Sequence, residues 1–164
     1  MNISKYILIF ILLIGVSGCG YGFPTGEHAS LPKDYRSLAI AEVEHPTTYP
    51  WMEARLRSLL RDELNRRNWV TWENKNKAKA LIKLYVEKYS RKATVTGVDQ
   101  ETLRSSASIT MRAVIVSRDT GRQLWSSGTI STNWPYYTGE EDEADAQVTE
   151  RAIQILAERL AQNY

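Results

Sequence analysis

The order of apolar patterns along the chain predicts an α+β domain. We expect a two-layer sandwich in which two helices pack on one face of a four-stranded, mostly antiparallel sheet. Two stretches carry the apolar spacing of an amphipathic helix and four carry strand patterns, in the order β-α-β-β-β-α. Two apolar helical stripes and one apolar sheet face can share a single core if both helices lie on the same side. The predicted domain spans residues 36–164.

The first strand and the first helix open this domain. Residues 37–44 are apolar on both faces, which is typical of a strand in the middle of a sheet. Pro50 suits the first turn of a helix, and we expect that helix to end near Asn68. A short extended piece follows at residues 69–72. The apolar stripe of the helix consists of Met52, Leu56, Leu59, Leu60 and Leu64.

The next two strands alternate between apolar and polar side chains. In residues 80–89 the predicted inward set is Ile82, Leu84 and Val86, and the outward set is Lys83, Tyr85, Glu87 and Tyr89. In residues 106–116 the inward set is Ile109, Met111, Ala113 and Ile115, and the outward set is Ser108, Thr110 and Arg112. The outward sets make an unusually polar, open sheet face. This face is the main structural indication of a functional surface.

A hairpin and a helix complete the domain. Residues 119–122 read as a turn, and residues 123–131 as the partner strand, which ends before Trp134–Pro135. The final helix is expected over residues 141–162. Its apolar stripe is Val148, Ala152, Ile155 and Leu156.

The total charge argues against one class of partner. The 164 residues include 21 Lys and Arg against 19 Asp and Glu, a formal net charge of +2. Bulk nucleic-acid binding usually needs a strongly basic domain. We therefore expect no nucleic-acid partner.

Cys19 is the only cysteine of the chain, and small residues precede it after an apolar run from Ile7 to Val16. With Lys5 ahead of the run, this is the pattern of a bacterial lipoprotein signal. The run is too short for a permanent span, which needs roughly 20 apolar residues. We predict a signal peptide at residues 1–18, then diacylglycerol and an N-acyl chain, such as palmitate, on Cys19.

The residues after Cys19 predict where the protein resides. Gly20 is not the aspartate that retains lipoproteins in the inner membrane of enteric bacteria. We expect anchoring to the outer membrane on its periplasmic side, through a tether at residues 19–35 that is rich in Gly and Pro.

Catalytic and metal-binding motifs are absent from the sequence. His28 and His45 are isolated, and no nucleophile elbow, phosphate-binding glycine loop or paired metal motif occurs. The acidic run at 140–145 starts a helix, where acids complement the helix dipole, and it lacks the spacing of a calcium loop. We expect no enzyme, no metal and no cofactor beyond the acyl chains.

Basic side chains gather at the predicted hairpin between residues 89 and 106 and on the open face beside it. Neighbouring arginines and lysines match phosphate groups well. The alternative is an ordinary solvated sheet face. The candidates are Lys88, Arg91, Lys92, Arg104 and Arg112. Three aromatic residues also suit an interface with lipid or a membrane protein, namely Trp134, Tyr136 and Tyr137.

Taken together, these residues resemble the LptE family of lipopolysaccharide-assembly lipoproteins. The similarity is diffuse, covers nearly all of the chain after the signal, and is most distinctive at Cys19-Gly20-Tyr21. The other matching segments are Gly22-Phe23, Leu31-Pro32, Thr47-Thr48-Tyr49-Pro50 with Glu53 and Leu56, and Gly121-Arg122-Gln123-Leu124-Trp125.

The resemblance implies a two-helix, four-stranded fold and a protein that is not an enzyme. Members of the family plug the lumen of the outer-membrane β-barrel LptD, help that barrel assemble, and act with it to place lipopolysaccharide in the outer leaflet. LptD and lipopolysaccharide are therefore the implied partners. The five basic candidates would then contact phosphates of lipid A or the core sugars.

A different class of function stays open. Lipoproteins that regulate a peptidoglycan synthase, or serve an envelope transporter as an auxiliary subunit, share the signal and a small α+β domain. They typically need a longer tether, whereas about 15 residues span roughly 50 Å at full extension. The short tether favours a partner within the membrane. A lipid-anchored hydrolase lacks a visible nucleophile and base.

Overall fold

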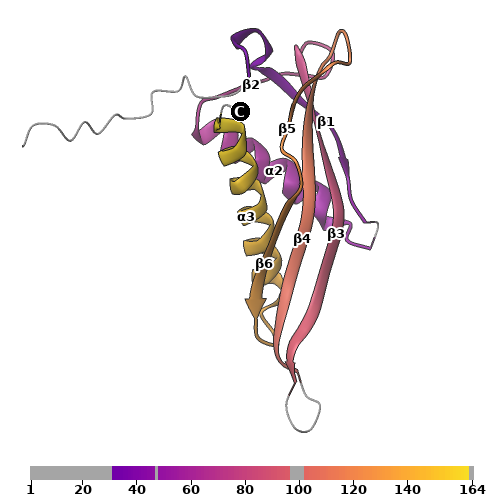
Figure 1. Ribbon diagram of the computed structural model, residues 1–164, viewed down its shortest axis with the longest axis vertical. Coiled ribbons are helices and arrows are strands. Elements are labelled where there is room, and N and C mark those ends of the chain that lie inside the picture. Colours follow the sequence, from indigo (N-terminus) through magenta and orange to yellow (C-terminus); the bar gives the residue numbers. More distant parts are fainter. Residues whose placement is uncertain (1–30, 47, 97–101, 163–164) are drawn as a thin grey trace, which may run out of the picture.

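The computed structural model describes residues 31–46, 48–96 and 102–162. Both α-helices lie on one face of a sheet, so the described chain forms two layers (Figure 1). No helix within these ranges is long and apolar enough to cross a membrane. The elements in chain order are the 3-10 helix η1 (Lys33–Tyr35), β1 (Ser37–Glu44), α2 (Trp51–Arg66), β2 (Thr71–Trp72), β3 (Ala80–Thr96), β4 (Thr102–Ser117), β5 (Gln123–Ser126), β6 (Ile130–Tyr136) and α3 (Glu141–Ala161).

The sheet differs from the prediction. The α+β class and the two-helix layer are confirmed, but the four-stranded, mostly antiparallel sheet is wrong: the sheet has six strands and is mixed. Its order is β2-β1-β3-β4-β5, with β6 also paired to β4. Strand β1 runs parallel to both β2 and β3, and the remaining pairs are antiparallel.

Two short features account for the extra strands. Strand β2 pairs with β1 through only two residues, which a sequence pattern shows poorly. The segment expected as one strand over 123–131 breaks at Gly128, whose φ of 62° interrupts the extended backbone. Beside the break, Ser127 Oγ accepts a hydrogen bond from the backbone N–H of Ala113 at 2.8 Å, which fixes Ser127 against β4. The break separates β5 from β6.

The core lies between the sheet and the helices. The predicted inward sets of β3 and β4 are confirmed: Ile82, Leu84, Ile109, Met111, Ala113 and Ile115 are each 0% exposed, and Val86 is 6% exposed. In α3 the inner row includes Ile153, whereas Ile155 is only partly buried. Leu31, in the segment expected to be a tether, also joins the core.

Strands β3 and β4 form a hairpin that is longer than predicted. Strand β1 pairs only with residues 80–85 of β3, so the rest of β3 continues past β1 (Figure 1). Strand β6 flanks the β4 side of this extension. We call residues 86–96 and 102–112 the distal hairpin.

Candidate ligand-binding surface on the distal hairpin

A β-bulge at Glu87 determines which side chains of β3 reach the open face. The pairing register with β4 passes over this residue. Beyond it, Tyr89 lies opposite the core residue Ile109 and is itself 7% exposed. The predicted outward orientation of Tyr89 is therefore wrong, because one extra residue moves all later side chains to the opposite faces.

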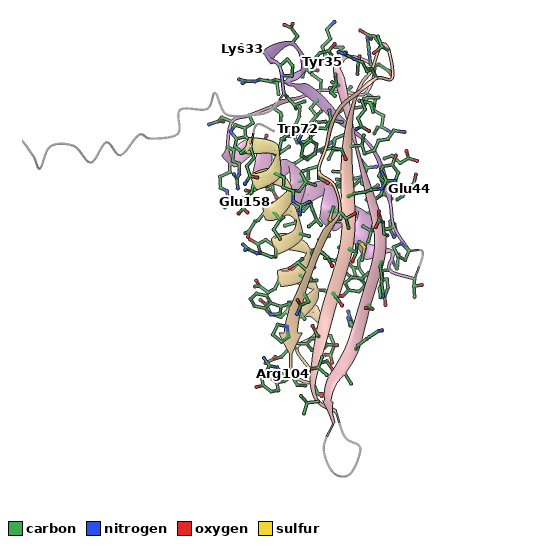
Figure 2. All side chains as sticks on the ribbon, viewed as in Figure 1. Lys33, Tyr35, Glu44, Trp72, Arg104 and Glu158 are labelled. Carbon is green, nitrogen blue, oxygen red and sulfur yellow. The ribbon has the colours of Figure 1, made fainter. Side chains whose placement is uncertain are left out.

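The five predicted basic residues all lie on the distal hairpin, but on different faces. Lys88, Lys92 and Arg112 sit opposite outward residues of the neighbouring strand and belong to the open face. Arg91 lies opposite the buried Ala107 and points towards the helices. Arg104 is exposed near the distal end of the hairpin (Figure 2). The expected single basic cluster is thus divided by the sheet.

Arg91 is neutralised by a buried carboxylate on α3. Its Nε donates to Asp145 Oδ1 at 2.9 Å, its other guanidinium nitrogen donates to Oδ2, and the Tyr89 hydroxyl also donates to Oδ1. The Asp145 side chain is 5% exposed. The hydrogen bond with the Asp145 carboxylate raises the pKa of Arg91. Burial, with the Asp145 hydrogen bond second, raises the pKa of Tyr89. A guanidinium held in this way is not available to a phosphate group.

Arg112 also has an acidic partner. Its Nε lies 3.2 Å from Glu87 Oε1, and its guanidinium lies 4.0 Å from the centre of the Tyr85 ring. Lys83 is placed similarly, with Nζ 3.2 Å from Glu42 Oε2, and this hydrogen bond raises the pKa of Lys83. Each of these two cations would have to leave its carboxylate partner before it could bind an anionic ligand.

Lys88 and Lys92 differ from these residues. Among the residues that the structure describes, no carboxylate forms an ion pair with either lysine. Both side chains border a shallow depression floored by hydroxyl groups. We call this surface the lysine–hydroxyl patch; it consists of Lys88, Ser90, Lys92, Ser108, Thr110 and Ser131.

The hydroxyl groups of the patch bond to one another across three strands. Ser90 Oγ lies 3.4 Å from Ser108 Oγ, and Thr110 Oγ1 lies 3.2 Å from Ser131 Oγ. Each hydroxyl keeps further donor or acceptor capacity, and each ammonium group carries three donors. The patch can therefore bind an anionic group together with neighbouring sugar hydroxyls.

Sequence reasoning found the lysines of the patch and missed two of its serines. The face on which Ser90 lies depends on the bulge at Glu87, and Ser131 is the second residue of β6, just after the break at Gly128. Neither irregularity appears in an alternating pattern. The run of hydroxyl residues at 105–110 of β4 was the available signal.

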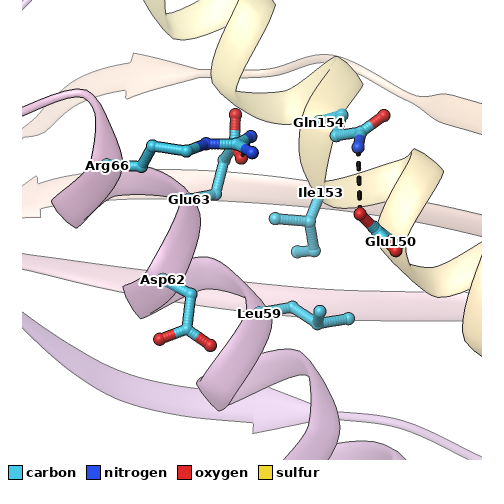
Figure 3. Close-up of a pocket in the computed structure, with 7 residues that line it drawn as sticks. All are labelled: Leu59, Asp62, Glu63, Arg66, Glu150, Ile153 and Gln154. Atoms are coloured by element: carbon cyan, nitrogen blue, oxygen red, sulfur yellow. Dashed lines mark hydrogen bonds and ion pairs between the residues drawn. The ribbon is translucent and has the colours of Figure 1, made fainter.

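The hollow between the two helices has different chemistry. It has a volume of about 140 Å³ and is lined by Leu59, Asp62, Glu63, Arg66, Glu150, Ile153 and Gln154 (Figure 3). The buried Glu63 accepts hydrogen bonds from Arg66 and Arg67, so its negative charge is already paired. Asp62 and Glu150 would repel an anion. Within the described ranges, no three His, Cys, Asp or Glu side chains are placed to hold a metal ion.

The predicted aromatic interface is partly assembled. Trp134 and Tyr137 are 40% and 59% exposed, whereas Tyr136 is buried in the core. Val95 is 47% exposed, also on the distal hairpin. Trp134 lies opposite the buried Ala107, so it belongs to the helix face of the sheet and not to the face that carries the lysine–hydroxyl patch. The predicted lipidation site, Cys19, lies outside the described residues.

Solved bacterial proteins share this fold. The minor lipoprotein of Acinetobacter baumannii is 19% identical with a TM-score of 0.53, over 77% of this chain and 93% of that chain. Uncharacterized lipoprotein B of Nitrosomonas europaea is 15% identical with a TM-score of 0.58, over 86% and 89%. PelC of Paraburkholderia phytofirmans is 15% identical with a TM-score of 0.52, over 81% and 91%. At these identities the similarity concerns the fold alone.

Sequence comparison adds the family. No curated protein matches the chain. The profile of the LptE family, described as lipopolysaccharide-assembly, matches residues 35–163, which include all strands and α-helices of the described residues. The resemblance carried by the sequence motifs is confirmed, and the chain belongs to the LptE lipopolysaccharide-assembly family.

Proposed function

We propose that this protein is a non-enzymatic lipoprotein of the outer membrane that binds lipopolysaccharide through the lysine–hydroxyl patch. In this proposal it is lipidated at Cys19, plugs an LptD-type β-barrel and assists the assembly of that barrel. Family membership supports the role in lipopolysaccharide assembly. The observation that carries the ligand site is the pair of lysines without acidic partners beside a row of hydroxyls.

The chemistry of the patch suits the headgroup of lipopolysaccharide. Phosphates on a sugar backbone present anionic oxygens next to hydroxyls, and lysine and serine side chains provide matching donors. Both α-helices lie on the other face of the sheet, so the patch is open to a large ligand (Figure 1). Exposed Val95, which lies opposite Arg104 on the distal hairpin, offers an apolar contact for an acyl chain.

A barrel lumen suits the rest of the surface. The interiors of outer-membrane barrels are polar, and this chain has a near-neutral charge of +2. The polar sheet face and the ion pairs along it, such as Lys83 with Glu42, match such surroundings. These features support the plug role that the family implies.

The ligand site is tested by replacing both lysines of the patch. We expect Lys88→Ala with Lys92→Ala to weaken lipopolysaccharide binding by about tenfold or more, since charge-assisted hydrogen bonds contribute about 1.5–3 kcal/mol each. Affinity is measured on the purified full chain in detergent, at fixed ionic strength.

A matched control removes the same charge elsewhere. Lys75 and Lys77 are exposed in the turn before β3, away from the patch. Lys75→Ala with Lys77→Ala should leave affinity nearly unchanged. Equal losses in the two double variants would mean that only net charge matters, and unchanged affinity in the patch variant would exclude this site.

A further inference from the structure

One edge of the sheet is open along the distal hairpin. Strand β1 pairs with β3 only as far as Tyr85, and no other described strand pairs with β3 on that side. The register with β4 is regular from Lys88 to Ala93, between the bulges at Glu87 and Thr94. This window of β3, residues 88–93, is called the free edge below.

The hydrogen bonds of β4 show which backbone groups point to the free edge. The N–H of Ser127 donates to the carbonyl of Ala113, so Ala113 directs its backbone groups away from β3. In an antiparallel ladder this direction alternates residue by residue. The odd-numbered residues of β4 from Ala113 to Ser105 therefore all turn away from β3.

Three residues of β3 lie opposite those odd-numbered residues and so form the non-hydrogen-bonded pairs of the ladder. Their own N–H and C=O groups point out to the free edge. These residues are Tyr89, Arg91 and Ala93. The free edge thus presents an alternating row of donors and acceptors, as an added strand requires.

The other long edges of the sheet are obstructed. In β6, Pro135 lies opposite Ser106 in a non-hydrogen-bonded pair of the β4–β6 ladder, so the backbone of position 135 faces the outer edge, and proline provides no N–H there. In β1, a bulge lies between Ile40 and Glu42, and Arg57 donates to the Ile40 carbonyl at 3.3 Å. Bulges, proline and covering side chains are the usual means of blocking an edge.

We propose that the free edge of β3 binds an extended, acidic segment of a partner protein, which adds to the sheet as a further strand. The acidic character follows from charge. Lys88 and Lys92 border the free edge on the open face, without an ion-pair partner among the described residues. Cross-strand pairs of opposite charge stabilise a ladder, and like charges opposite one another destabilise it.

The same charges disfavour a second copy of this chain as the occupant. Antiparallel pairing of two copies about Ser90 would place Lys88 of one copy opposite Lys92 of the other. Pairing about Arg91 would place the two Arg91 side chains opposite each other. Both arrangements oppose like charges across the new ladder. A segment in which acidic residues alternate with apolar ones avoids this.

The test uses two short peptides and hydrogen exchange. The first peptide alternates glutamate with valine over seven residues; the second has lysine at each glutamate position. Amide exchange of the full chain in detergent is followed by NMR. The acidic peptide should slow the amides of Tyr89, Arg91 and Ala93 by about an order of magnitude near saturation. The amides of Lys88 and Lys92, already bonded to β4, should not change.

One variant separates the backbone contact from charge. Ala93→Pro removes an N–H that points to the free edge and spares the ladder to β4; Ala93→Val keeps that N–H. We expect the proline variant to bind the acidic peptide several-fold more weakly than the valine variant, with unchanged lipopolysaccharide affinity. That split distinguishes failure of this proposal from failure of the ligand site.

Four results would overturn the proposal. The first is no slowing of the Tyr89, Arg91 and Ala93 amides at a peptide concentration of about 1 mM. The second is equal protection by the acidic and the lysine peptides. The third is protection of the three amides in the chain alone, which would assign the edge to its own residues or to a second copy. The fourth is equal binding by the proline and valine variants while the Lys88 and Lys92 amides stay protected.

Discussion

At the scale of single residues, Asp145 connects two parts of the molecule that are distant in sequence. Its carboxylate on α3 accepts hydrogen bonds from Tyr89 and Arg91 on β3. The acidic run at 140–145 was interpreted as a helix start, and its first-turn members Glu141, Asp142 and Glu143 confirm that. Asp145 instead lies one turn further, on the buried side of the helix.

Removing this carboxylate should destabilise the fold. We expect Asp145→Ala to lower the free energy of unfolding by about 1–3 kcal/mol, because the buried Tyr89 hydroxyl loses its acceptor and the partly exposed Arg91 guanidinium loses its counter-charge. Denaturant titration measures the change. Glu143→Ala, an exposed acid on the same helix, is the control and should cost less than about 1 kcal/mol. Similar losses in both variants would contradict the role of Asp145.

Tyr89 should make the fold sensitive to alkaline pH. Burial raises its pKa in the folded state above the ordinary 10.0. Above that value the unfolded chain loses the phenol proton first, so the unfolded state binds fewer protons and stability falls as pH rises. Between about pH 9 and 11, unfolding free energy should fall more steeply for the native chain than for Tyr89→Phe. Parallel curves would exclude this linkage.

At the scale of elements, the bulge at Glu87 determines which face of the sheet each later side chain of β3 occupies. It places Lys88, Ser90 and Lys92 on the open face and turns Arg91 towards Asp145. The lysine–hydroxyl patch and the ion pair between Arg91 and Asp145 therefore depend on the same extra residue. Without the bulge, the alternation that starts at Ile82 would turn Lys88, Ser90 and Lys92 towards the core. It would place Arg91 on the open face.

Two single-residue deletions test this reading of β3. Deleting Glu87 removes only the extra residue, so later side chains keep their faces; we expect a loss of about 1 kcal/mol or less, from its pair with Arg112. Deleting Ser90 moves Arg91 to the open face and puts Lys92 in its place facing Asp145. Because a lysine cannot reproduce the two hydrogen bonds of the guanidinium, we expect a loss of about 1–3 kcal/mol. Thermal or denaturant unfolding compares them. Equal destabilisation by the two deletions would contradict the assignment of Glu87 as the extra residue of the bulge.

At the scale of the whole molecule, the proposed barrel partner gives the sharpest test. We expect affinity purification of the tagged full chain from detergent-solubilised outer membranes to recover a very large β-barrel in stoichiometric amount. Association with a membrane partner suits the proposed lipid anchor at Cys19 and the short tether predicted after it. Recovery of a peptidoglycan synthase or an envelope transporter instead would support the alternative class of function.

Much of the fold follows from local patterns. The stripe of α2 and the alternation in β4 depend on spacing, because a helix buries every third or fourth residue and a strand every second. Met52, Leu56, Leu60 and Leu64 are fully buried, as that spacing predicts, and Leu59, the fifth residue of the predicted stripe, is partly buried. The candidate site was predicted less well. The correct hairpin was identified, but Arg91 was assigned to a ligand that its position facing Asp145 excludes.

The sequence by itself determined the two helices, the main strands, their order, the family and the presence of a basic hairpin with an open polar face. These properties depend on residue type and period, which are local. The tertiary structure alone decided the number of strands, the faces of β3 and the partners of each charge. A bulge is set by pairing with a neighbouring strand, and a cation is free or neutralised according to which carboxylate packing brings near it. For this reason Lys88 and Lys92, rather than Arg91, are the cations left open to a ligand.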